Sequence, residues 1–119
     1  HLPGSGVTLD NLSDTWTGLM IAGPKAREVL SRVATADVSN TAFPFLSART
    51  LELEGATQAV VVRVSFTGEL GYEIYSPAHF QYTLWDALVR AGADLGLTPA
   101  GTRALMSLRL EKKLGVGER

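Results

Sequence analysis

Two carboxylates lie four residues apart in the stretch FTGELGYEIY, residues 66–75. Glu69 is flanked by glycines that permit a tight turn, and a glutamate in such a turn is usually solvated. Glu73 lies in the strand that follows, where side chains alternate between the two faces of a sheet. This alternation predicts Gly71 and Tyr75 on the face of Glu73, where the glycine leaves space and the tyrosine offers an aromatic ring. A carboxylate held there can accept two parallel hydrogen bonds from a flat ligand edge that carries two donors.

A simpler interpretation of Glu73 stays open: a solvated strand residue that pairs across the ladder with Arg63. Arg103, near the start of the last predicted helix, carries a planar fork that suits a carboxylate and could extend toward Glu73. An arginine at this end of a helix is unfavourably placed in the helix dipole, which hints at a binding role but leaves a plain surface arginine open. Arg109 lies on another face of the same helix, where its stem can cover apolar surface.

Hydrophobic periodicity and turn residues predict the elements that position these side chains. The pattern indicates an α+β fold, with helices packed on one face of a mainly antiparallel sheet, because hairpin-joined strands alternate with amphipathic helices. Trp85 falls on the apolar stripe of its helix and is expected to pack inward. The predicted strands are 15–23, 49–55, 57–67 and 72–76. Three helices are predicted: the first begins at Gly23-Pro24, and the other two cover 77–96 and 97–113.

Composition narrows the class of protein. The chain has 119 residues, 45% of them hydrophobic, which is typical of one folded domain. Its net charge of -1 gives no basic excess for a nucleic-acid partner. With no cysteine and only His1 and His79, no metal site is expected. No apolar run reaches the roughly 20 residues of a membrane span, and no signal peptide is visible, so a cytoplasmic location is expected.

Two blocks together resemble a known family. VRVSFTGELGYEIYSPAHF (62–80) and GLTPAGTRALMSLRLEKK (96–113) are similar to the folate-binding module of the glycine cleavage T-protein family of tetrahydrofolate-dependent aminomethyltransferases. WTGLMIAGPKAREVLSRV (16–33) and ADVSNTAFPFLSARTLEL (36–53) look most like the relatives fused to flavin enzymes, the dimethylglycine and sarcosine dehydrogenases or oxidases. The resemblance covers residues 12–115 and implies a single folate-binding domain, 1–119, that is a fragment of a larger enzyme.

The resemblance also implies residue roles. The glutamate of the GYE block, Glu73, would grip the pterin ring of tetrahydrofolate, and the arginine of the AGTRAL block, Arg103, would contribute to the folate site. Tyr72 and Arg63 would be neighbours of that site, and Glu69 would belong to the turn. No catalytic residue is assigned, because the family's acidic residue lies upstream of this chain. The fragment alone is therefore expected to be inactive.

In the full enzyme, either a flavin-linked demethylase or a stand-alone aminomethyltransferase, tetrahydrofolate would take up a one-carbon unit from an N-methylated glycine or an aminomethyl carrier, and any FAD would occupy a domain outside this chain. Contact with such an upstream domain is expected. Two alternatives remain: a non-catalytic folate-binding or scaffold module of the same fold, and a structural domain with an inert surface. The relatives that assist iron–sulfur assembly usually carry a cysteine motif, which this chain lacks.

Overall fold

A four-stranded antiparallel sheet organises the molecule, and the computed structural model describes residues 6–112. The strand order is β1-β4-β3-β2, so β1 and β2 form the edges. This arrangement confirms the predicted α+β class and antiparallel sheet. The strands are β1 (Trp16–Ala22), β2 (Ala48–Leu53), β3 (Ala56–Val62) and β4 (Gly71–Pro77); the helices are α1 (Ala26–Val33), α2 (Gln81–Gly92) and α3 (Thr102–Glu111), with 3-10 turns η1 (Ala78–Phe80) and η2 (Ala93–Leu95).

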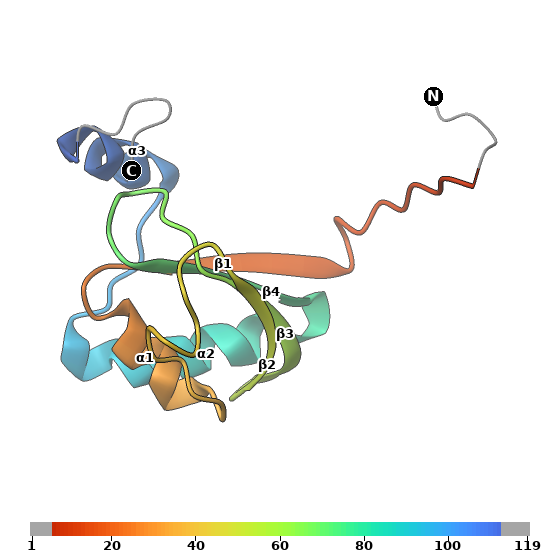
Figure 1. The fold of residues 1–119 in the computed structure, drawn as a ribbon, viewed down its shortest axis with the longest axis horizontal. Helices are drawn as coiled ribbons and strands as arrows, with labels where there is room; N and C mark the ends of the chain where they lie inside the picture. Colours follow the sequence, from red (N-terminus) through yellow and green to blue (C-terminus); the bar gives the residue numbers. More distant parts are fainter. Residues whose placement is uncertain (1–5, 113–119) are drawn as a thin grey trace.

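One face of the sheet is covered by α1 and α2, which lie below the sheet in Figure 1. Alternate strand residues are buried there, including Val61, Tyr72 and Ile74, none of which has exposed surface. Leu30 of α1 and Leu84 of α2 are also fully buried in this core. Burying one such side chain stabilises the fold by roughly 1.5–3 kcal/mol, so the buried side chains of this layer stabilise the packing of the helices on the sheet.

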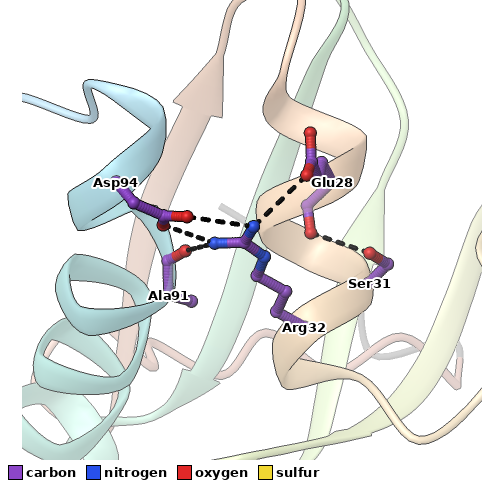
Figure 2. A network of polar contacts seen from close by, with 5 residues as sticks. All are labelled: Glu28, Ser31, Arg32, Ala91 and Asp94. Carbon is purple, nitrogen blue, oxygen red and sulfur yellow. Dashed lines mark hydrogen bonds and ion pairs between the residues drawn. The ribbon is translucent and has the colours of Figure 1, made fainter.

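A polar clamp joins the two covering helices (Figure 2). The Arg32 guanidinium donates to the Asp94 carboxylate at 2.6 Å and to the Ala91 carbonyl at 2.7 Å. Glu28, one helical turn before Arg32, accepts a further contact at 3.3 Å. The clamp therefore fixes the end of α2 and η2 against α1 at the surface.

The third helix is arranged differently. In Figure 1, α3 lies above the sheet, beside the β3–β4 loop, and none of its residues is buried. The sequence predicted a helix from residue 97, but α3 begins at Thr102. Leu97 donates its N–H to the Gly92 carbonyl and packs against Gly92, and the chain then runs without helical structure to Gly101. α3 thus lies away from the covered face, and none of its residues joins the core there.

Two predicted strands also differ from the observed ones. β1 was expected to be a buried strand, yet it is an edge strand in which only Ile21 is buried, because its other face is not covered by a helix. β3 ends at Val62 rather than at Thr67. The segment after it forms a loop closed by the Ser65 hydroxyl, which donates to the Glu69 carbonyl at 2.6 Å.

Candidate functional site

The face of the sheet opposite α1 and α2 is open, and we call it the open face. Its centre consists of outward residues of β1, β3 and β4. Trp16, Met20 and Tyr75 keep 37%, 37% and 39% of their surface exposed. Large apolar side chains gathered on an exposed surface often mark a binding site. The open face is lined by Trp16, Gly18 and Met20 of β1, Val60 and Val62 of β3, and Gly71, Glu73 and Tyr75 of β4.

Glu73 is the carboxylate at the centre of the open face. The strand register places it directly between Met20 of β1 and Val62 of β3, so both cross-strand neighbours are apolar. The predicted placement of Glu73 and Tyr75 on one face is confirmed. The alternative ladder partner, Arg63, is wrong because Val62 occupies the position opposite Glu73. A half-buried carboxylate without a cationic neighbour on the adjacent strands retains acceptor capacity for a ligand.

Tyr75 is the polar partner of Glu73. Its hydroxyl donates to Oε2 of Glu73 at 2.6 Å. The hydrogen bond to Glu73 raises the pKa of Tyr75, and desolvation and the nearby negative charge act in the same direction. Tyr75 therefore stays protonated at neutral pH and remains a donor. The aromatic ring and the carboxylate form one unit on the open face.

Arg63 and Tyr72, both predicted as neighbours of the site, contact the 37–47 segment instead. Nη1 of Arg63 donates to the Asn40 side chain at 2.7 Å and to the Phe43 carbonyl at 2.8 Å. Tyr72 is fully buried on the covered face, its ring 5.6 Å from that of Phe43. Within residues 6–112 its buried hydroxyl has no hydrogen-bond partner. Both residues can support the strand that carries Glu73, and a direct part in ligand binding stays a prediction.

Arg103 is exposed at the second position of α3. Among the described residues, no hydrogen bond or ion pair joins it to Glu73. The structure therefore does not bring these two predicted residues into contact, and a shared ligand would have to bridge them. The role of Arg103 stays a prediction.

Two contacts missed by the sequence analysis attach α3 to the β3–β4 loop. Arg109 stacks its guanidinium 4.8 Å from the Phe66 ring centroid and donates to the Phe66 carbonyl at 2.7 Å. Lys112 pairs with Glu69 at 2.6 Å, so Glu69 is not simply solvated. Because this loop leads directly into β4, the two contacts connect the helix of Arg103 to the strand of Glu73.

An apolar cavity of about 350 Å³ lies between β1, α2 and α3. Trp85 and Val89 of α2 and Leu105 and Leu108 of α3 line it, together with the 97–100 segment. Trp85 was predicted to pack inward, yet it is 43% exposed and forms part of this cavity wall. The cavity adjoins the open face through Gly18 and Met20.

Two features are absent from residues 6–112: a cluster of metal-binding side chains and a helix that could cross a membrane. No group of three histidine, cysteine or carboxylate residues is close enough there to hold a metal ion. No helix in the described part of the chain has the length and apolar character needed to cross a bilayer. The cytoplasmic location stays a prediction.

Comparison with known proteins decides the family. Residues 1–118 match the family model described as the GCVT N-terminal domain. The chain belongs to this family. The predicted resemblance to the glycine cleavage T-protein and its flavin-linked relatives is thereby confirmed.

Proteins similar in sequence to this chain include enzymes of three kinds. The chain is 43% identical to the sarcosine oxidase subunit alpha of Rhizobium meliloti over 92% of its length, and 38% identical to the mitochondrial dimethylglycine dehydrogenase of Homo sapiens over 92%. It is 39% identical to an aminomethyltransferase of Caldanaerobacter subterraneus over 91%. It spans 11%, 12% and 28% of these proteins, respectively.

A solved structure shares the fold. The heterotetrameric sarcosine oxidase from Corynebacterium sp. U-96, in complex with pyrrole 2-carboxylate, matches with a TM-score of 0.62 and 26% sequence identity. The match covers 76% of this chain and 44% of that chain.

Proposed function

We propose that residues 1–119 form a folate-binding domain of a larger tetrahydrofolate-dependent one-carbon transfer enzyme that acts in the breakdown of glycine, sarcosine or dimethylglycine. The family is one of folate-dependent one-carbon transfer enzymes, and relatives named for three such activities support the proposal. The chain spans a minor part of those relatives, so the reaction centre and any FAD would belong to other regions. Alone, this domain is expected to be inactive.

The observation that carries the proposal is the Glu73 carboxylate on the open face. The amino-pyrimidine edge of a pterin presents adjacent N–H donors, and a carboxylate accepts two parallel hydrogen bonds from such an edge. Met20 and Val62 flank Glu73 and offer apolar contact without competing charge. The residues present therefore fit a flat, donor-rich ring.

Other residues would act around this anchor. Arg103 would hold an anionic part of the folate with its guanidinium, which suits a carboxylate. Arg63 and Tyr72 would support β4 from the covered side through their contacts with Phe43. Tetrahydrofolate, when bound, would supply the nitrogen atoms that take up the one-carbon unit. The chain itself binds and orients the ligand.

The proposal is tested by calorimetric titration of the complete protein with 5-formyltetrahydrofolate. Replacing Glu73 with alanine should weaken binding roughly 10- to 150-fold, the equivalent of about 1.5–3 kcal/mol for hydrogen bonds to a charged group. Glu52→Ala is the matched control, because Glu52 is exposed on the same sheet face but on the far edge strand β2. Its affinity should equal that of the wild type.

Equal affinity of the Glu73→Ala variant and the wild type would reject the folate site. Tight binding without one-carbon transfer by the complete protein would instead favour the alternative, a non-catalytic folate-binding or scaffold module.

A further inference from the structure

The Tyr75 hydroxyl contacts the Glu73 carboxylate directly. The two residues are two positions apart on β4 and share the open face, and the hydroxyl reaches Oε2 at 2.6 Å. A free glutamate side chain loses rotamer freedom when a ligand fixes it, which weakens binding. A glutamate already held by a neighbour loses less, so binding to it is tighter.

The hydrogen bond leaves the carboxylate able to bind. Each carboxylate oxygen has two lone pairs, so Tyr75 uses one of about four acceptor positions. The remaining positions on Oε1 and Oε2 suffice for two parallel N–H donors. Tyr75 therefore sets the direction of the carboxylate without blocking it.

Gly18 makes room for this arrangement. It lies opposite Tyr75 in the β1–β4 ladder. A Cβ atom at Gly18 would lie 3.1 Å from Cε1 and 3.3 Å from Cδ1 of the Tyr75 ring, closer than ordinary contact. A side chain at Gly18 would therefore require the Tyr75 ring to give by a few tenths of an ångström. The lack of a side chain at Gly18 thus leaves room for the ring in the position from which its hydroxyl contacts Glu73.

The surroundings of the pair contain little competing charge. The cross-strand neighbours are Gly18 and Met20 on β1 and Val60 and Val62 on β3, none of which titrates. The preceding segment, residues 9–13, borders an open hollow of about 630 Å³ together with Tyr75 and Gly18, and Asp10 is its one titratable residue. Glu73 is therefore the charged group that acts most directly on the titration of the Tyr75 hydroxyl.

We propose that Tyr75, seated against Gly18, is a positioning residue that orients the Glu73 carboxylate toward the donor edge of the pterin. This inference rests on the proposed function. It assigns the hydroxyl of Tyr75 to ligand affinity rather than to stability of the sheet, and it makes Gly18 the residue that determines where the hydroxyl lies.

The test measures the Kd of 5-formyltetrahydrofolate for the complete protein. Tyr75→Phe keeps the ring and removes the donor, so the Kd should rise roughly three- to tenfold, the effect of one lost hydrogen bond. Tyr82→Phe is the matched control, because Tyr82 is 78% exposed on α2, away from the open face, and its Kd should not change. A wild-type Kd for Tyr75→Phe, alongside weakened binding by Glu73→Ala, overturns the inference and leaves the proposed function standing.

Two further readouts separate positioning from structure. In the Glu73→Ala background, where no side-chain acceptor is left for the Tyr75 hydroxyl, Tyr75→Phe should change the Kd by less than about twofold, because the two residues act through one contact. An undiminished effect there overturns the inference. Gly18→Val should weaken binding in the wild type and leave it unchanged in the Tyr75→Ser background, where no ring is left to displace. If Gly18→Val weakened folate binding equally in both backgrounds, Gly18 would not act through the Tyr75 ring, and its proposed role would be overturned.

The alkaline pH profile gives an independent check. Ionised Tyr75 would no longer donate and would repel Glu73, so wild-type affinity should fall as the pH rises above the ordinary tyrosine pKa of about 10. The raised pKa of Tyr75, due mainly to its hydrogen bond with Glu73, moves this loss to higher pH. Titration of the ligand affects the wild type and Tyr75→Phe equally, so the difference between the two profiles isolates Tyr75. Coincident profiles overturn the inference.

Discussion

The covered face and the open face of the sheet are made from alternating residues of the same strands, yet their chemistry differs. On β4, Tyr72 and Ile74 have no exposed surface and pack among apolar side chains, whereas Glu73 and Tyr75 hydrogen-bond each other on the uncovered side. Adjacent residues thus divide two tasks. The covered face supplies stability by burial, and the open face leaves polar groups available to a ligand. Stability and binding should therefore respond to different substitutions on one strand.

The largest expected effect is a loss of stability caused by a substitution on the covered face. Ile74→Ala should lower the free energy of unfolding by about 2–5 kcal/mol, because it removes buried methyl groups and leaves a cavity. Chemical denaturation measures this loss, and the milder Ile74→Val should cost about 0.5–1.5 kcal/mol. The fraction that remains folded should bind folate with unchanged affinity. A stability loss below that of Ile74→Val would contradict the division between the faces.

A smaller effect concerns α3, which is attached through surface contacts. Arg109→Met keeps much of the apolar stem but removes the stacking on Phe66 and the hydrogen bond to its carbonyl. The local stability of α3 should fall by about 1–2 kcal/mol. Hydrogen exchange should show faster exchange of amides in 102–111, while β3 and β4 stay protected. Arg103→Met is the control on the same helix, and equal exchange in both variants would show that Arg109 does not secure α3.

The smallest effect tests the clamp between the covering helices. The hydrogen bond from Arg32 lowers the pKa of Asp94 below its ordinary value. The folded state therefore favours the ionised carboxylate, and this contribution to stability is present above the ordinary aspartate pKa and lost as the pH falls through the folded one. Asp94→Asn should lower stability at neutral pH and weaken its dependence on acid below about pH 5.

The control for the clamp is Asp86→Asn, an exposed aspartate on α2. Some acid dependence should remain in Asp94→Asn, because the backbone N–H of Ser39 also lowers the pKa of Asp37. Denaturation curves of the three proteins at each pH measure the difference. Identical pH dependence of stability in the wild type and Asp94→Asn would contradict a stabilising role for the Arg32–Asp94 contact.

Local patterns predicted the parts of the site that lie on one element. Alternation along β4 placed Glu73 and Tyr75 on one face and Tyr72 on the other, because the period of a strand is a local property. The same argument could not find Gly18 and Met20 as neighbours of Tyr75 and Glu73. That pairing depends on the register of β1 against β4, strands about fifty residues apart whose contact is set by tertiary packing.

Contacts between distant segments explain the remaining differences. Arg63 was a plausible partner of Glu73 by strand pattern, but β3 ends at Val62 and the Arg63 side chain instead holds Asn40 and the Phe43 carbonyl. The attachment of α3 by Arg109 and Lys112 likewise needs the position of the β3–β4 loop. Helical periodicity shows which residues share a helix face, but it does not show which loop that face meets.

The proposed folate site depends most on the Glu73 carboxylate as a ligand-binding group, and one isosteric substitution tests this role directly. Glu73→Gln keeps the shape of the side chain but replaces one acceptor oxygen with a donor amide, which would face the donors of the pterin edge. Calorimetry should record a folate Kd raised at least tenfold, with a free energy of unfolding within about 0.5 kcal/mol of the wild type. A Kd equal to that of the wild type would contradict the central claim.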